Sequence, residues 1–443
     1  MKTVASGWFA LPVGMYLLLA LLYLWAVPIG ESPDEPGHVR CLEQVAIENQ
    51  LPRMVMLENK TINWWARENI LSDYMCYHMP LYYVSGGVWL RLASGRSGTP
   101  EHLEFPPTNP NFNDTPGMFV HHTDEPAQPL RFVILRLASI LLGLVVLWGA
   151  AVVAGRVFPD EPVIALLAVT LIAGWPQFVF LSRSISNDLL ATACAVGVLV
   201  ILTDVGKPER FAWAAFVAAL AFLTKLSVAF TVGMVMATWL VELVFLAEKR
   251  GRYLRPLLEM MVVFLALGLL VRFQPVLWEN WQISLSDFSG SAGSIQQSAY
   301  WQQVYVWTQN SGWAWFGWLT VMPPAWHAQL WWFIIELASL LGLYVALKRP
   351  SPRQHRILLL ILGLWWLFVA ISYVRVTSNR WQPQFRFAFA VLPVLATFTA
   401  GALLLPFPTV RRWQWSTWGG VMVVLFLYNL WLIWQIILPA YAA

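Results

Sequence analysis

Apolar runs of about 20 residues recur along the 443-residue chain, and they constrain its fold more than any other feature. A helix needs about 20 apolar residues to cross the hydrocarbon core of a bilayer. Charged residues make up only 12% of this sequence, whereas a soluble protein carries roughly a quarter. The sequence therefore predicts an all-α, polytopic membrane protein in which residues 1–443 form a single transmembrane domain.

About eleven spans are expected. The first runs from Trp8 to Ile29, and we interpret it as an uncleaved helix because it is too long for the apolar core of a secretory signal peptide. Lys225 could lie at a break between two short helices. The other spans are expected near residues 131–155, 162–182, 188–204, 211–225, 227–247, 256–276, 326–347, 357–374, 386–405 and 415–437.

Lys and Arg gather in a few short loops, and such loops usually face the cytoplasm. The basic loops are residues 207–210, 248–255, 348–356 and 411–412. They share one side only if residues 30–130 and 277–325 form two large loops outside the cytoplasm, with the N-terminus inside and the C-terminus outside. The net charge of +4 is therefore topological and does not indicate a nucleic-acid partner.

The first outer loop, residues 30–130, is expected to contain structure. Residues 42–51 and 74–92 are amphipathic, which is typical of helices that lie in the membrane interface rather than crossing it. Residues 94–130 are rich in Pro, Asn, Gly and Thr, so we expect an irregular loop there. Cys41 and Cys76 share this outer loop and could pair in an oxidising compartment, whereas Cys194 lies in an apolar run and is expected to pack.

The segment Ser32-Pro-Asp-Glu-Pro-Gly-His38 follows the first span directly. Two adjacent carboxylates and a histidine beside a low-dielectric boundary form a candidate functional site. The alternative is that Asp34 or Glu35 favours the free N–H groups of the next helix. Asp188 begins the fourth expected span on the same outer side, where it too could be a cap. Two outer-face acids within the first four spans favour a shared site.

Basic residues are also expected at the depth of these acids. Each one alone could be a snorkelling side chain or an aromatic contact. Together with the acids they describe a site that needs a carboxylate base and cations for a phosphate. Arg386 opens an otherwise apolar helix, where a guanidinium is costly unless it is paired. The candidate cations are Arg183, Lys225, Arg375, Arg380 and Arg386.

Glycosyl transfer from a lipid-linked donor requires these groups at this depth. Nucleotide sugars are absent outside the cytoplasm, so a sugar donor there must be lipid-linked, with its polyprenyl tail in the bilayer and its phosphate at the interface. Transfer then needs a carboxylate to deprotonate the acceptor hydroxyl and cations to stabilise the leaving phosphate.

The order of these motifs resembles that of GT-C glycosyltransferases, such as protein O-mannosyltransferases and lipid A aminoarabinose transferases. The acidic pair after the first span, with His38, resembles their signature. Within the superfamily the chain is most similar to an uncharacterised bacterial family with an outer PDEPxH motif. The other matching segments, between residue 33 and about 393, are His78-Met-Pro-Leu-Tyr-Tyr83 ("PPLYY"), Leu135-Arg-Leu-Ala-Ser139 ("RLPS"), Ser182 to Asp188, Leu223-Thr-Lys225 ("LTK"), Trp315-Phe-Gly-Trp318 and Gln384-Phe-Arg-Phe387 ("QGRY").

This resemblance implies a GT-C fold in a bacterial inner membrane and the transfer of a hexose or pentose from a polyprenyl-phosphate donor, usually with inversion, to a lipid, glycan or protein. Asp34 matches the family's general base and Asp188 its second acid, and Glu35 could tune Asp34. Lys225 and Arg386 match positions associated with the lipid phosphate. His38, Arg183, Arg375, Arg380 and Tyr82 are further expected substrate contacts.

The resemblance leaves some details open. The segment before Tyr83 lacks the first Pro of "PPLYY", and the segment around Arg386 lacks the Gly and Tyr of "QGRY", which puts the donor contacts in doubt. Some GT-C enzymes need a divalent metal such as Mg or Mn. Asp34, Glu35, His38 and Asp188 are residue types that could hold one, but their spacing predicts no metal site.

Other functions remain open from the sequence. A secondary transporter or a flippase for lipid-linked sugars would place ionisable groups near the bilayer midplane and often shows inverted repeats, whereas here the charges lie at one face and no repeat is visible. A glycan polymerase or ligase would use the late outer loop, where Glu279 and Asp287 lie. A structural scaffold would not explain acids and cations gathered on one side.

Overall fold

The computed structural model describes residues 6–54, 70–93, 102–112, 115–121, 129–246, 251–289, 294–349, 352–380, 382–404 and 411–441. Within these ranges the chain is helical and has no β-strand, only two isolated bridges, Thr108 to Phe119 and Phe316 to Val321. The expected all-α fold is confirmed.

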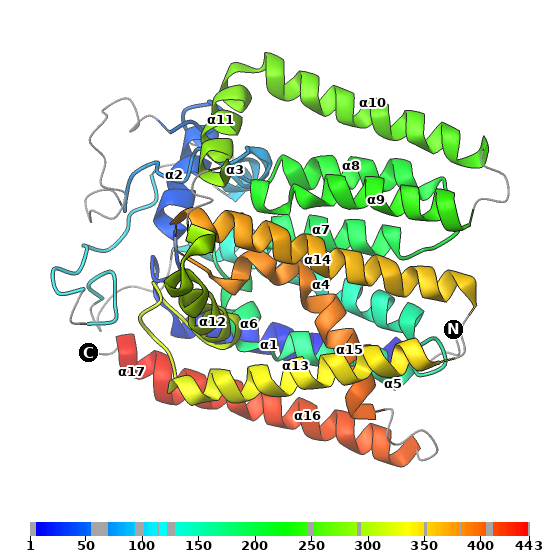
Figure 1. Cartoon of the computed structure of the whole chain (residues 1–443). Coiled ribbons are helices and arrows are strands. Elements are labelled where there is room, and N and C mark those ends of the chain that lie inside the picture. The colour runs from blue at the N-terminus through cyan, green and yellow to red at the C-terminus, as the bar shows by residue number, and fades with distance from the viewer. Residues whose placement is uncertain are drawn as a thin grey trace.

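Helices that run side by side, most of them long, form the body of the molecule (Figure 1). They are α1 (Ala10–Ala26), α4 (Leu130–Val157), α5 (Pro162–Ala173), α6 (Pro176–Ser182), α7 (Asp188–Leu202), α8 (Arg210–Phe222), α9 (Phe230–Phe245), α10 (Gly251–Phe273), α13 (Ala325–Lys348), α14 (Arg353–Arg380), α15 (Leu392–Leu404), α16 (Arg411–Leu432) and α17 (Leu438–Tyr441).

Four further helices gather at one end of this body (Figure 1). They are α2 (Glu35–Ala46), α3 (Leu81–Ala93), α11 (Pro275–Ser289) and α12 (Ser298–Trp313). The remaining helical turns are the 3-10 segments η1 (Ser6–Phe9), η4 (Leu226–Val228), η5 (Ser294–Gln296) and η6 (Phe385–Val391), and the π-helical η7 (Ile433–Ile437).

Eight helices in the described ranges are long and apolar enough to cross a membrane, and the bent pair α5 and α6 would make nine if it is one span. The two parts of that pair meet at 64°. Two further apolar helices, α7 and α8, are shorter, with 15 and 13 residues. Each of the expected apolar runs coincides with one of these helices, but the count of about eleven spans stays a prediction.

The two amphipathic segments of the first outer loop do form helices, but their bounds differ from the expected 42–51 and 74–92. The first helix already begins at Glu35, because proline fits the unbonded first turn of a helix and Pro36 occupies that turn. The second begins at Leu81, directly after Pro80. Residues 70–79 form turns instead. The helix α3 has 13 residues and is too short to span a bilayer.

The two ends of the body carry different parts of the chain, and the assignment of one end to the outer side stays a prediction. The chain start, the ends of α9 and α13 and the starts of α10, α14 and α16 all lie at one end (Figure 1). These helix ends border three of the four basic loops, 248–255, 348–356 and 411–412, of which residues 248–250 and 350–351 lie outside the described ranges. The opposite end carries α2, α3, α11 and α12, which belong to the two large outer loops.

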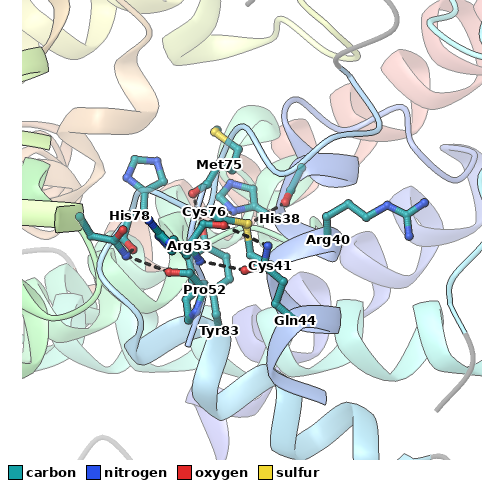
Figure 2. The surroundings of a disulfide bond; sticks show 12 residues. His38, Arg40, Cys41, Gln44, Pro52, Arg53, Met75, Cys76, His78 and Tyr83 are labelled. Atoms are coloured by element: carbon teal, nitrogen blue, oxygen red, sulfur yellow. Dashed lines mark hydrogen bonds between the residues drawn. A yellow bond between two sulfur atoms is a disulfide. The ribbon is translucent and has the colours of Figure 1, made fainter. Parts of the chain in front are cut away.

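A disulfide joins Cys41 in α2 to Cys76 in the turn before α3, with Cα atoms 5.2 Å apart (Figure 2). The sequence left the pairing of these two cysteines open, and the structure contains it. Cys194 is a free, partly buried thiol that packs against the main core, as expected. The disulfide holds the turn at residues 70–79 against the helix that follows Asp34.

Candidate functional site

Four charged side chains from distant parts of the chain meet at the end of the body that carries α2 and α3. Asp34 lies directly before α2, Asp188 is the first residue of α7, Lys225 lies in the break before η4, and Arg386 is in η6. We call these four residues the charge quartet. All four were expected from the sequence.

Arg386 connects the two acids of the quartet. Its Nη2 donates to Asp34 Oδ2 at 2.6 Å, and its Nη1 donates to Asp188 Oδ2 at 3.4 Å. Lys225 Nζ donates to the other oxygen of Asp188 at 2.5 Å. The side chains of Arg386, Lys225 and Asp188 are 7%, 7% and 3% exposed, whereas that of Asp34 is 18% exposed. Asp34 is therefore the member of the quartet that is open to a ligand.

The backbone conformation of Asp34 is unusual. Its φ angle is 64°, in the left-handed region that few residues other than glycine adopt. It occupies the position before the first turn of α2, but within the described residues its side chain makes no capping hydrogen bond. The carboxylate instead accepts hydrogen bonds from Arg386 and from Tyr74 Oη, the latter at 3.2 Å. Capping therefore does not account for Asp34.

The quartet shifts the proton affinities of its members. Burial raises the pKa of Asp34, but the Arg386 guanidinium together with His38 and Lys225 outweighs this effect and holds the pKa below its usual range. Burial lowers the pKa of Lys225, against the favourable carboxylate of Asp188. Burial and the neighbouring carboxylate of Asp34 both raise the pKa of Tyr74. At neutral pH, Asp34 is thus an anion that accepts a hydrogen bond from a neutral phenol.

Glu35 lies beside Asp34 in sequence but points to different partners. Its two oxygens accept from Arg136 Nε at 2.9 Å and from Arg136 Nη2 at 2.7 Å. The backbone N–H groups of Gly30 and Ile185 add two more hydrogen bonds, at 3.0 and 3.2 Å. Both side chains of this ion pair are fully buried. The pair locks the start of α2 to α4 and to the turn before α7.

His38 lies one turn after Asp34, so both residues occupy the same side of α2. Its Nδ1 is 2.9 Å from Tyr83 Oη, and its ring stacks on that of Tyr83 with centroids 5.8 Å apart. The ring of Tyr82 meets His38 edge-on at 6.2 Å. Burial lowers the pKa of His38 to about 4, so the imidazole is neutral at pH 7. The structure thus places His38 and Tyr82 beside the quartet.

The other expected cations do not contact the quartet. Arg183 is fully buried, lies 4.4 Å over the Phe180 ring, and has no hydrogen-bond partner in the described part of the chain. Its main charged neighbours are Arg136 and Glu35, and burial lowers its pKa to about 9. Arg375 is exposed on α14. Arg380 ends α14, but its side chain lies outside the described residues.

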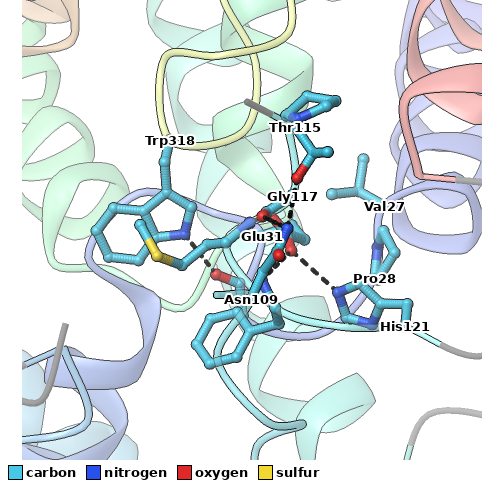
Figure 3. Close-up of polar contacts among 12 residues, drawn as sticks. Val27, Pro28, Glu31, Asn109, Thr115, Gly117, His121 and Trp318 are labelled. Atoms are coloured by element: carbon cyan, nitrogen blue, oxygen red, sulfur yellow. Dashed lines mark hydrogen bonds and ion pairs between the residues drawn. The ribbon is translucent and has the colours of Figure 1, made fainter. Parts of the chain in front are cut away.

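The outer loops pack over this end of the body. Glu31 accepts hydrogen bonds from the backbone N–H groups of Met118 and Phe119 at 3.1 and 2.9 Å and contacts His121 Nε2 at 3.0 Å (Figure 3). Trp318, from the Trp-Phe-Gly-Trp segment, donates its indole N–H to the Gly30 carbonyl at 2.9 Å. These contacts hold Gly30 and Glu31, just before Asp34, in place.

The late outer loop shows a different kind of contact. Glu279, in α11, forms an ion pair with Arg53 at 2.9 Å, and both side chains are more than a third exposed. The side chain of Asp287 lies outside the described residues. In the part of the chain that the structure describes, no group of three or more His, Cys, Asp or Glu residues is arranged to hold a metal ion. We therefore derive no metal-dependent step.

Tyr74, Tyr83 and Arg136 also belong to the site, and the sequence did not single them out. Arg136 carried a usable signal, because an arginine inside a long apolar run is costly unless it is paired. Its segment also matches a family motif. Tyr74 carried no such signal, because it lies in an irregular turn whose position against Asp34 depends on the disulfide at Cys76.

Comparison with known proteins gives the fold. Searches against protein-family models and against curated protein sequences find no match. Among solved structures, the chain is similar to ArnT from Cupriavidus metallidurans bound to undecaprenyl phosphate, with a TM-score of 0.52 and 17% identity over 99% of this chain and 74% of that one. The expected GT-C fold is confirmed by this likeness and by the one that follows.

The second likeness is to the oligosaccharyltransferase AglB from Archaeoglobus fulgidus in complex with an inhibitory peptide and a dolichol-phosphate, with a TM-score of 0.51 and 12% identity over 97% of this chain. The same archaeal enzyme tethered to an acceptor peptide gives 0.54 and 13% identity. This chain spans about half of the archaeal chain, at 55% and 56% in the two structures.

Proposed function

We propose that this protein is a membrane glycosyltransferase that moves a sugar from a polyprenyl-phosphate donor to an acceptor outside the cytoplasm. The observation that carries the proposal is the charge quartet, which joins an accessible carboxylate to two buried cations on a GT-C fold. Structures of that fold were solved with dolichol-phosphate and with undecaprenyl phosphate. The disulfide and the position of the basic loops both favour the extracytoplasmic side for the quartet.

Each group of the quartet has a role in this reaction. The acceptor hydroxyl oxygen attacks the anomeric carbon, and the carbon–oxygen bond to the phosphate breaks. The electron pair leaves with the polyprenyl phosphate, which Arg386 and Lys225 stabilise. The hydroxyl proton passes to Asp34, the general base. Asp188 holds both cations in place, as the second acid of the site.

The arrangement of the quartet also links donor binding to the basicity of Asp34. In the resting site Arg386 holds the pKa of Asp34 below its usual range. A donor phosphate between Arg386 and Lys225 competes for the guanidinium that Asp34 holds. Asp34 then regains proton affinity when the donor is in place, and the base is activated only in the loaded site.

The test is a transfer assay with purified protein in lipid nanodiscs, using undecaprenyl-phosphate monosaccharides and a panel of lipid, glycan and peptide acceptors. Asp34→Asn should lower transfer by about 10²–10⁴-fold, the usual contribution of a general base. The matched control is Asp204→Asn, at the opposite end of the body, where Asp204 pairs with Lys207 at the surface. That variant should transfer at the wild-type rate.

Two results would contradict this proposal. One is near-normal transfer by Asp34→Asn protein whose size-exclusion profile matches that of the folded wild type. The other is translocation of a lipid-linked sugar across proteoliposomes by the wild-type protein and by Asp34→Asn alike, with no product formed. The second result would identify a flippase.

A further inference from the structure

The hydrogen-bond pattern around His38 fixes where its proton lies. Tyr83 Oη is 3.1 Å from the Met75 carbonyl oxygen and 2.9 Å from His38 Nδ1. A carbonyl oxygen can only accept, so the single hydroxyl proton of Tyr83 points to Met75. Tyr83 must then accept from His38, and Nδ1 carries the imidazole proton. Nε2 is left with a lone pair.

That lone pair is buried and without a partner. His38 is 1% exposed, and no hydrogen-bond donor in the described part of the chain reaches Nε2. A buried acceptor that lacks a donor has lost its hydrogen bond to water and gained none in return, which is unfavourable. Arg386 Nε, in the quartet itself, is also buried without a partner in the described part of the chain. Unpartnered polar atoms that gather beside an accessible carboxylate indicate that a ligand supplies the missing groups.

The surroundings of His38 belong to the proposed reaction site. The charges that act most strongly on its imidazole are those of Asp34, Lys225, Asp188 and Arg386, the four members of the quartet. The aromatic rings of Tyr82, Tyr83 and His78 stand around it, with centroids 5.8 to 6.2 Å away. An uncharged acceptor inside a ring of aromatic side chains, next to the acids, is suited to a neutral polyol.

The carboxylates of the quartet are already engaged, but Nε2 is not. Asp34 and Asp188 accept from Arg386, Lys225 and Tyr74. An anionic phosphate beside Nε2 would be repelled, because its oxygens and the unprotonated nitrogen are both hydrogen-bond acceptors. A hydroxyl would instead supply the missing donor. A hydroxyl of the bound sugar fits Nε2, and it is not the reacting one, because in the proposed reaction that hydroxyl gives its proton to Asp34.

We propose that His38 Nε2 binds a non-reacting hydroxyl of the sugar held beside Asp34, and so selects sugars that carry a hydroxyl at that ring position. This inference rests on the glycosyl transfer proposed above. The hydroxyl could belong to the sugar of the donor or to a sugar of the acceptor. His38 acts as a positioning and specificity residue and keeps its own proton throughout.

The experiment pairs protein variants with deoxy sugars. One arm uses polyprenyl-phosphate donors that lack one hydroxyl at a time, and the other uses glycan acceptors that lack one hydroxyl at a time. For the wild-type protein, the kcat/KM of one deoxy compound should be about ten- to a hundred-fold lower than that of the parent, because removing this hydroxyl leaves one buried acceptor unpaired. The arm in which this compound occurs identifies the sugar.

The variants show whether His38 causes the loss. His38→Phe keeps a flat ring but has no acceptor, so it should transfer the parent and that deoxy compound equally well. His38→Gln offers an amide oxygen near the position of Nε2 and should restore part of the discrimination. A residue that is merely structural would lower transfer of all compounds by the same factor. Size-exclusion profiles of both variants check the fold.

The outcomes separate the two proposals. If His38→Phe and the wild type discriminate every deoxy compound alike, the role of His38 is wrong while the glycosyltransferase proposal stands. If water alone fills the space beside Nε2, no deoxy compound shows a selective loss, and the role of His38 is again wrong. If the wild type transfers no sugar from any polyprenyl-phosphate donor, the proposed function fails and this inference falls with it.

Discussion

Asp34 and Glu35 are neighbours in sequence, and each pairs with an arginine, yet the two pairs have opposite surroundings. Glu35 and Arg136 are fully buried, and the carboxylate accepts four hydrogen bonds from Arg136, Gly30 and Ile185. Asp34 is 18% exposed and shares its arginine with Asp188. The first pair leaves no room for a ligand. The second can exchange a protein partner for one, which is what a reaction site requires.

The fully buried ion pair of Glu35 and Arg136 should contribute most to stability. Arg136→Met leaves the carboxylate of Glu35 buried without its cation, and breaking a buried ion pair from one side costs about 3–5 kcal/mol. We expect a large fall in the midpoint temperature of thermal unfolding of the detergent-solubilised protein, measured by tryptophan fluorescence. Asp34→Asn should lower the transition much less, because the site is partly exposed.

A double variant sharpens this prediction. Glu35→Gln combined with Arg136→Met removes both charges while the amide oxygen still accepts from the backbone N–H groups. The double variant should be more stable than Arg136→Met alone. Equal or lower stability would mean that the ion pair does not stabilise the start of α2 in the way that its geometry suggests.

The disulfide should support both the stability of the protein and the position of Tyr74 beside Asp34. It closes a loop of 35 residues and holds the turn that carries Tyr74 against α2, and the loss of a cross-link of this size costs about 3–4 kcal/mol in the chain-entropy model. Cys41→Ala with Cys76→Ala should lower both stability and transfer. Cys194→Ala is the matched control and should change neither.

The pH dependence of stability should separate His38 from the carboxylates. The pKa of His38 is lowered from 6.5 to about 4 in the folded protein, so the unfolded chain binds the extra proton first as the pH falls. Stability is then lost between pH 6.5 and about 4, by about 3 kcal/mol. The pKa of Asp34 is also lowered, and its contribution is lost at lower pH still.

This pH prediction is checked by thermal transitions of the wild type and His38→Phe at pH 7 and at pH 4.5. The wild type should lose more stability than the variant over this range, because the variant has no imidazole to protonate. Identical losses would mean that His38 titrates in its ordinary range.

The smallest effect is expected for Tyr74→Phe. This change removes one hydrogen bond from Asp34 and should cost about 0.5–1.5 kcal/mol. It should also raise the proton affinity of Asp34 slightly, because an anion loses a donor. In the pH–rate profile of transfer, the fall in rate on the acid side should therefore occur at higher pH. A fall that occurs at lower pH would contradict the contact between Tyr74 and Asp34.

The gathering of the quartet was predictable because its members share a depth. Asp34, Asp188, Lys225 and Arg386 each end or begin an apolar run, and the basic loops show which ends face the same side. The helical fold followed from the same runs. These inferences need only sequence positions, because the bilayer aligns the helices.

Other parts of the site depend on the direction of a side chain, which spacing does not give. Arg183 is close to Asp188 in sequence but turns toward Glu35 and Arg136. Glu35 turns away from Asp34, although the two are adjacent. Tyr74 lies in a turn where the amphipathic pattern predicts a helix, and the disulfide at Cys76 holds that turn against α2. Tyr83 reaches the site from the start of α3. Such contacts follow from tertiary packing alone.

The ion pair between Asp34 and Arg386 joins residues 352 positions apart. Asp34 leaves the ribosome near the start of synthesis, and Arg386 follows only after most of the helices have been made. Until then the Asp34 carboxylate lacks the guanidinium of Arg386. A copy of the chain that stalls before residue 386 therefore cannot assemble the charge quartet, however many of its earlier helices have folded.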